Sequence, residues 1–333
     1  RGRAAYELDG AGRPAGGCGG NHCLVGQFGF VWSERQRGPR LRTKPAGRLN
    51  MKTVEVTQDP GLAEMFFGAL ESRRKQPGRV EQLPEVTLVR HDLVLDAAHI
   101  ARYTALCGFT PAQGVPLIYP QMLTFALVMQ YMNSPDCPWP ALGTVHLANA
   151  IEQTRSLHAG DRVRVEMATG ELFAHDKGQG YTLEMCIFRD DERVWRATQS
   201  LLRLGVKQPG GDAYAAQFGE FAPLSCQAQF NAAANIGRRY AAVSGDRNPI
   251  HLSALSARLL GFRRAIAHGM WSKAQALSCV LPQRPLEQAK VAVEFKTPLF
   301  LPSQPTLWTN GSAQFEVRDS NGQKPHLRGQ LDY

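Results

Sequence analysis

The chain has 333 residues, of which 43% are hydrophobic and 20% are charged, which suits one large or two ordinary domains and excludes disordered and fibrous classes. The formal net charge is +9, but residues 1–50 hold nine basic and three acidic side chains, so residues 51–333 carry only +3. This small excess makes nucleic-acid binding by the folded part a poor expectation.

Residues 1–50 differ in composition from the rest of the chain. They contain 11 glycines, many arginines and no methionine, without sustained periodicity, so we expect them to be disordered. Ordinary patterned sequence begins at Met51, which suggests the hypothesis that Met51 is the natural start and that the preceding residues are an extension. A transit peptide is the alternative, since arginine enrichment fits it, although the abundance of glycine does not.

The seven cysteines are odd in number and contain no Cys-x-x-Cys pair, so neither a disulfide framework nor a zinc site is predicted. Cys18, His22 and Cys23 lie close enough in the sequence to suggest a metal site, but no second ligand pair accompanies them, so metal binding is not expected there. Free thiols and the lack of an apolar signal segment favour a cytoplasmic protein. The most apolar run, 122–129, is far shorter than the ~20 residues that span a bilayer, so no membrane insertion is expected.

That run lies within a predicted helix over residues 121–132. Met122, Phe125, Met129 and Met132 recur at three- and four-residue steps, with Ile118 one turn earlier, which gives the helix one apolar face. Packing in the core is the first explanation of this face. Lining a ligand pocket is the alternative.

An internal repeat divides the chain. Residues 96–108 and 234–245 both predict a short helix that ends in a glycine, and their alignment matches Tyr103 with Tyr240. Residues 151–160 likewise parallel residues 293–302, and each segment precedes runs with strand-like composition. These runs are 162–167, 181–188 and 194–204 in the first copy, and 306–309, 313–317 and 327–331 in the second. Each copy therefore predicts a long helix with an antiparallel sheet, an α+β pattern.

The second copy alone carries a cluster of chemical groups. Asp246 and His251 lie on a loop with the turn-forming residues Gly245, Asn248 and Pro249. Five residues of extended chain would hold the two backbones roughly 16–18 Å apart, whereas a turn lets both side chains reach one small volume. At the same place the first copy has Phe-Thr-Pro and no nearby histidine, so we expect one reaction centre.

The segment 240–251 resembles the signature of the MaoC-like, or hydratase 2, family of (R)-specific enoyl-thioester hydratases and dehydratases. The family pattern is an aromatic residue, a spacer, Ser-Gly-Asp, a variable residue, Asn-Pro, an aliphatic residue and His, and every position is filled. Ala267-His268-Gly269-Met270 resembles the His-Gly-Met that opens the family's central helix. The resemblance implies the hot-dog fold, in which an antiparallel sheet wraps around that helix.

Two copies in one chain would form a double hot dog. We expect a degenerate N-terminal hot-dog domain over 51–205, a linker over 206–221 and a catalytic MaoC-like domain over 222–333. The linker contains Pro209-Gly-Gly-Asp212 and few periodic apolar positions. By resemblance to double-type enzymes, the first copy would be inactive and would shape the acyl pocket.

The resemblance implies a hydro-lyase that interconverts trans-2-enoyl and (3R)-3-hydroxyacyl thioesters. Asp246 and His251 would transfer protons on one water, Ser244 and Asn248 would position the water or the loop, and the N–H of Gly269 would bind the thioester oxygen. Tyr240 is also explained as a packed helix residue and Ser244 as a loop hydrogen bond, and the role of His268 stays open. The expected substrate-binding residues are Tyr240, His268, Met270, Tyr119 and Met122.

The resemblance implies that no metal or redox cofactor is needed. CoA or acyl carrier protein would carry the substrate. The chain could be a monomer or a homodimer. A hot-dog thioesterase is the alternative enzyme, in which water attacks the thioester carbonyl and a free thiol is released. A non-catalytic module that binds acyl thioesters is the third reading, favoured if Asp246 and His251 do not share a pocket.

Overall fold

The computed structural model describes residues 52–58, 61, 64, 67–68, 71–75, 78–311 and 313–333. The predictions for residues 1–50, for Met51 and for Cys18 and Cys23 therefore lie outside the described residues. The five cysteines that are described are all free. In this part of the chain, no helix is long and apolar enough to cross a membrane.

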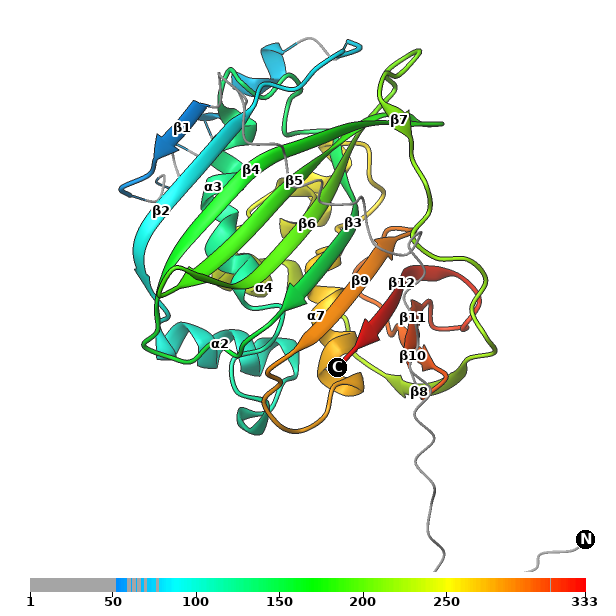
Figure 1. The fold of residues 1–333 in the computed structure, drawn as a ribbon. Coiled ribbons are helices and arrows are strands. Elements are labelled where there is room, and N and C mark those ends of the chain that lie inside the picture. The colour runs from blue at the N-terminus through cyan, green and yellow to red at the C-terminus, as the bar shows by residue number, and fades with distance from the viewer. Residues whose placement is uncertain are drawn as a thin grey trace, which may run out of the picture. The chain divides into compact units, whose positions relative to one another are not determined.

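One large sheet, almost entirely antiparallel, forms the front layer in Figure 1, and its strand order is β1-β2-β4-β5-β6-β3-β9-β12-β11-β10-β8. The N-terminal half contributes β1 (Lys52–Glu55), β2 (Val86–Val94), β3 (Thr144–Gln153), β4 (Arg162–His175), β5 (Gly178–Arg189) and β6 (Glu192–Leu204). The C-terminal half contributes β8 (Ser225–Gln229), β9 (Ala289–Phe295), β10 (Thr306–Thr309), β11 (Gln314–Arg318) and β12 (Pro325–Asp332). Between them, β7 (Asp212–Ala213) pairs with β4.

The helices gather behind the sheet (Figure 1). They are α2 (Ala97–Cys107), α3 (Pro120–Asn133), α4 (Ile236–Ser244), α5 (Pro249–Leu252), α6 (Ala254–Leu259) and α7 (Gly269–Val280), with short 3-10 turns η1 (Ser72–Arg74) and η2 (Pro111–Gln113). The long helix α3 packs on β2, β4 and β5, and α7 packs on β11 and β12. Each half is thus a sheet wrapped around one central helix, and the two together form the predicted double hot dog.

The helix boundaries follow from local residues. The Asp96 side chain accepts a hydrogen bond from the Ala98 N–H and caps α2, and Gly108 ends that helix with a left-handed φ of 79°. Gly245 ends α4 in the same way, with φ 77°. The predicted correspondence of the two helices is confirmed, since their tyrosines, Tyr103 and Tyr240, are both buried with ring centroids 6.3 Å apart.

The two halves join through the antiparallel pair of β3 and β9. The alignment of residues 151–160 with 293–302 makes Ala150 the counterpart of Ala292, and these two residues face each other in the register. Ile151 and Val293 are also counterparts of each other. Ile151 pairs with Val291, and Val293 pairs with Asn149. A local pseudo-twofold axis therefore passes between Ala150 and Ala292, as expected for two copies of one fold.

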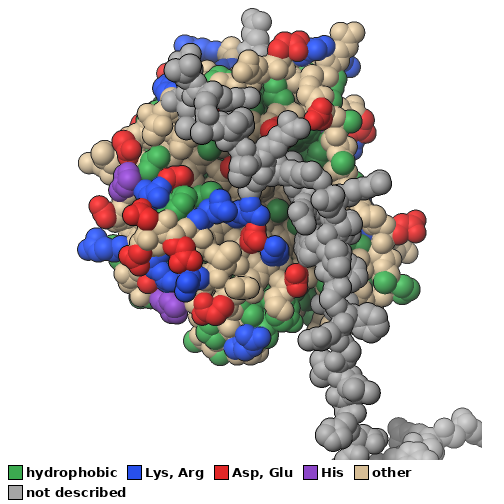
Figure 2. All heavy atoms as spheres, in the orientation of Figure 1, with side chains coloured by type: hydrophobic (Ala, Val, Ile, Leu, Met, Phe, Trp, Pro, Cys, Tyr) green, Lys and Arg blue, Asp and Glu red, His purple; other side chains and the backbone are tan. Residues whose placement is uncertain are grey.

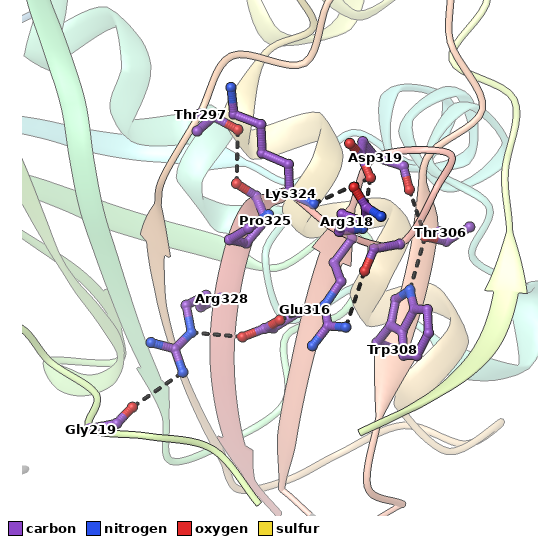
Figure 3. A network of polar contacts seen from close by, with 12 residues as sticks. Gly219, Thr297, Thr306, Trp308, Glu316, Arg318, Asp319, Lys324, Pro325 and Arg328 are labelled. Atoms are coloured by element: carbon purple, nitrogen blue, oxygen red, sulfur yellow. Dashed lines mark hydrogen bonds and ion pairs between the residues drawn. The ribbon is translucent and has the colours of Figure 1, made fainter. Parts of the chain in front are cut away.

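The segment 206–221 is tied to the C-terminal sheet by buried polar groups. The Glu294 carboxylate accepts hydrogen bonds from the Tyr214 hydroxyl at 3.2 Å and from the Gln217 N–H at 2.6 Å. Figure 3 shows Arg328 bridging Glu316 and the Gly219 carbonyl oxygen, at 2.7 and 3.2 Å. These contacts fix the course of the predicted linker, and the division of the chain at that segment stays a proposal.

Candidate active site

The loop between α4 and α5 is bent by a relay of hydrogen bonds. The Ser244 hydroxyl accepts from the Asp246 N–H at 3.2 Å, and the Asp246 carboxylate accepts from the Asn248 N–H at 3.0 Å. The Asn248 side chain then accepts from the Ile250 N–H at 3.3 Å and caps α5. The loop therefore holds Asp246 in place and starts the helical turn that carries His251.

Gly237 lets α5 approach α4 closely. A Cβ atom on Gly237 would lie 1.9 Å from the carbonyl oxygen of His251, so only glycine fits against this backbone. Arg238 adds a hydrogen bond from its guanidinium to the Leu252 carbonyl oxygen at 3.1 Å. The position of His251 thus depends on a residue fourteen positions earlier in the chain.

His251 is buried, with 8% of its surface exposed, and its tautomer follows from its partner. Its Nδ1 lies 2.8 Å from the carbonyl oxygen of Ile266. Because a carbonyl oxygen can only accept, Nδ1 carries the proton and donates it. In the neutral ring, Nε2 therefore keeps a free lone pair, which can accept a proton.

His268 lies between His251 and Tyr240. Its ring stacks on His251 with centroids 3.7 Å apart and an interplanar angle of 26°, and its centroid lies 4.9 Å from that of Tyr240. Its Nε2 donates to the Asp246 backbone carbonyl oxygen at 3.0 Å. Its Nδ1 is buried and has no hydrogen-bond partner among the described residues. His268 thus braces both proton-handling residues.

The environment sets the charge of each group. Burial raises the pKa of Asp246, but the imidazoles of His268 and His251 and the N–H of Asn248 outweigh it, so the pKa falls below its ordinary value. Burial lowers the pKa of His251, and the Asp246 carboxylate and the Ile266 carbonyl oppose this only in part. At neutral pH the pair therefore consists of a carboxylate and a neutral imidazole.

Asp246, His251 and His268 also have the composition of a metal-binding cluster, because one ligand atom from each lies within 4.8 Å of the others. One nitrogen of each ring already donates to a backbone carbonyl oxygen, and in His268 this is Nε2, the nitrogen that lies 3.7 Å from the Asp246 carboxylate. The pKa of His268 is lowered to about 3, mainly by burial, which leaves its ring neutral. Proton transfer needs the same groups without an ion, and the absence of a metal stays a prediction.

A cavity of about 960 Å³ opens beside this loop. Asp246 lines it with the 33% of its side-chain surface that stays exposed, so the carboxylate faces the cavity. One wall is formed by Met122, Phe125, Met129 and Met132, which the periodicity placed on one face of α3, together with Val128. Ile118, the other residue of the predicted face, does not line the cavity. The alternative explanation of these methionines, lining a pocket, therefore holds together with core packing.

The N-terminus of α7 supplies unpaired backbone donors to the cavity. Gly269 is the first residue of α7, and the preceding His268 makes no side-chain cap. A Cβ on Gly269 would lie 2.7 Å from the Phe295 ring, so glycine is needed for this packing. The site thus combines a carboxylate, an imidazole and a helix N-terminus, which attracts negative charge.

The structure brings nearly all the predicted site residues together. The cavity is lined by Met122, Tyr240, Ser244, Asp246, Asn248, His251, His268, Gly269 and Met270. Tyr119 is separated from them, because its hydroxyl lies 2.8 Å from Nδ1 of His99 and its ring packs on Tyr103. It is 1% exposed and lies outside the residues that line the cavity.

Sequence reasoning missed the polar residues that the N-terminal half contributes. His146 on β3 lines the cavity and packs on Phe295 with centroids 4.8 Å apart, and burial lowers its pKa to about 3. Gln121 on α3 also lines the cavity and accepts a hydrogen bond from Asn149, which in turn accepts from the buried Lys273 at 2.6 Å. No local pattern in the sequence marks these residues.

Sequence comparisons identify relatives of this chain. The family model described as MaoC like domain matches residues 228–303. The chain is 31% identical over 276 residues to 3-hydroxyacyl-thioester dehydratase X of Mycobacterium tuberculosis, which covers 82% of this chain and 98% of the relative.

Solved structures agree with this match. The crystal structure of HtdX of Mycobacterium tuberculosis has a TM-score of 0.62 and 29% identity over 74% of this chain and 98% of that chain. A MaoC-like dehydratase from Phytophthora capsici, 18% identical, shares the fold with a TM-score of 0.60 over 75% of this chain and 96% of its own. Since one relative matches over nearly its whole length and the motif falls within the family model, the chain belongs to the MaoC-like family.

Proposed function

We propose that the protein is a hydro-lyase that interconverts trans-2-enoyl and (3R)-3-hydroxyacyl thioesters. The observation that carries the proposal is the placement of Asp246 and His251 in one cavity wall, beside the N-terminus of α7. The name of the mycobacterial relative, a 3-hydroxyacyl-thioester dehydratase, supports the same reaction. The predicted cytoplasmic location and oligomeric state stay predictions.

In the hydration direction, a water molecule would bind between the Asp246 carboxylate and Nε2 of His251. The carboxylate orients the water as a hydrogen-bond acceptor, and Nε2 takes one of its protons as the oxygen attacks C3 of the enoyl group. The C2=C3 electron pair moves toward the thioester and gives an enolate. The proton is then delivered to C2, so that H and OH are added across the double bond.

The enolate needs donors for the thioester oxygen. The backbone N–H groups at the start of α7, above all that of Gly269, are preorganised for this charge because no side chain caps them. The same groups serve the reverse reaction, in which protonated His251 returns its proton to the departing hydroxyl group.

The acyl chain would extend along α3. Met122 lies near the loop, since its sulfur is 3.8 Å from the Tyr240 hydroxyl, and Met132 lies ten residues further along the helix. At 1.5 Å per residue, this wall is ~15 Å long. Such a wall suits a medium or long acyl chain better than a four-carbon one.

The test follows the absorbance of the enoyl-thioester chromophore with crotonyl-CoA and with trans-2-dodecenoyl-CoA, while a thiol reagent records hydrolysis. Loss of absorbance without thiol release, reduced at least 100-fold by Asp246→Asn and by His251→Ala, is the expected result. Asp191→Asn, in an exposed hairpin turn, is the matched control and should behave as the wild type.

Three outcomes contradict the proposal. Release of thiol at the rate of absorbance loss would identify a thioesterase. Turnover that survives both Asp246→Asn and His251→Ala would place the reaction elsewhere in the molecule. If neither substrate reacts on CoA or on acyl carrier protein, the chain is a binding module.

A further inference from the structure

The arginines of the folded part are concentrated around the catalytic loop. Residues 236–266 contain six arginines and one acidic residue, a charge of +5, whereas residues 51–333 together carry only +3. The rest of residues 51–333, without residues 236–266, is therefore slightly acidic. On the face seen in Figure 2, basic and acidic side chains alternate without a comparable cluster.

Four of these arginines, which we call the arginine rim, are Arg247, Arg258, Arg263 and Arg264. All four are exposed, and none forms an ion pair with a carboxylate of the described residues. The rim is partly ordered, because Arg258 donates to the Arg263 carbonyl oxygen and the guanidinium of Arg263 lies 4.3 Å from the centre of the Phe300 ring. An acidic partner would meet positive charge that is not already neutralised.

Two leucines project beside the rim. Leu255 and Leu259 are one turn apart on α6 and are 72% and 81% exposed, more than any other large hydrophobic residue among those described. Two neighbouring leucine side chains in contact with water contribute no burial energy to the fold, and exposed apolar residues flanked by charge typically mark a protein contact.

The surface lies beside the opening of the catalytic cavity. Leu252 and Phe262, which flank α6 in the chain, both line the cavity, and so does Arg247. A thioester delivered to Asp246 must therefore arrive with its carrier close to α6. The carrier, rather than the acyl chain, is the group that this surface would contact.

We propose that α6 and the arginine rim dock acyl carrier protein, so that the enzyme works on protein-bound rather than CoA-bound acyl groups; this rests on the proposed function above. The phosphates of CoA would pair with the arginines but would leave Leu255 and Leu259 in water. A carrier protein that presents carboxylates around an apolar side chain satisfies both features.

The experiment compares kcat/KM for crotonyl-acyl carrier protein and crotonyl-CoA. The double variant Leu255→Ser/Leu259→Ser should lose at least tenfold on the protein-bound substrate and stay within twofold on CoA. The variant Arg258→Glu should lose at least tenfold on the protein-bound substrate and less on CoA, whose phosphates meet the same arginines. Val94→Ser, at an exposed position on β2, should change neither value. Equal losses on both substrates, or no loss on the carrier protein, would overturn the proposal.

A second measurement is independent of turnover. The Asp246→Asn variant should bind holo-acyl carrier protein, and Leu255→Ser/Leu259→Ser added to it should abolish the binding. Absence of turnover on both carriers would refute the proposed function. Binding of holo-acyl carrier protein that is unchanged by the leucine substitutions would refute only the proposed docking on α6. Light scattering that shows a dimer dissociated by the leucine changes would assign the surface to a second copy of the chain instead.

Discussion

Gly237→Ala adds one methyl group outside the cavity and tests how the site is held. The new Cβ would lie 1.9 Å from the His251 carbonyl oxygen, and since such atoms do not come closer than 3.0 Å, α5 must move by at least 1.1 Å. A displacement of about 1 Å from reacting groups costs on the order of 100-fold in rate. We therefore expect kcat for crotonyl thioester hydration to fall by about that factor.

The stability of this variant should change much less than its activity. Alanine is favoured over glycine inside a helix by about 0.8–1.0 kcal/mol, whereas overpacking costs about 1–3 kcal/mol. Urea unfolding should therefore show a loss of no more than about 2 kcal/mol. The control is Gly219→Ala, since Gly219 is exposed with no atom within 4 Å of the added carbon. Wild-type kcat in Gly237→Ala would refute this account of how His251 is positioned.

Three further predictions concern the cavity, the core and the response to acid. Met129→Trp should narrow the far part of the cavity, so kcat/KM should fall at least tenfold for trans-2-dodecenoyl-CoA and less than twofold for crotonyl-CoA. Equal effects on the two substrates would contradict the proposed path of the acyl chain along α3. Lys273→Ala should lower the free energy of unfolding by about 2–4 kcal/mol, because it leaves a cavity and removes the donor to Asn149, while Lys273→Met should cost less in the same urea titration. The pKa of His268 is about 3 in the folded chain and ~6.5 in the unfolded chain, so the unfolded chain binds more protons between these values. The free energy of unfolding should therefore decline as the pH falls from ~6.5 toward 3. A constant free energy of unfolding between pH 7 and 4.5 would contradict this.

Local features of the sequence predicted much of the fold. The helix over 121–132 is α3, and the six predicted runs overlap β4, β5, β6, β10, β11 and β12, although β4 continues beyond the predicted 162–167 to His175. Two features account for this success: strands that are buried on one face alternate in polarity, and glycines such as Gly108 and Gly245 end helices through their own conformation. The turn-forming residues likewise predicted the bend in the loop that carries Asp246 and His251.

Long-range packing accounts for what the sequence did not predict. The strands β3 and β9 were not predicted, and β3 has a register shift near His146 that interrupts its alternation. Tyr119 immediately precedes α3, yet packing turns it toward α2 and away from the cavity. Gly237 resembles any helical glycine until the backbone of His251 is placed against it.

The pairing of β3 with β9 also bears on how the chain can be divided. In isolation, the N-terminal half would end its sheet at β3 and the C-terminal half would end at β9, each with a free row of backbone donors and acceptors. Long apolar edge strands of this kind recruit other chains and aggregate. A chain cut within residues 206–221 should therefore stay in solution only when both pieces are produced together, each covering the open edge of the other.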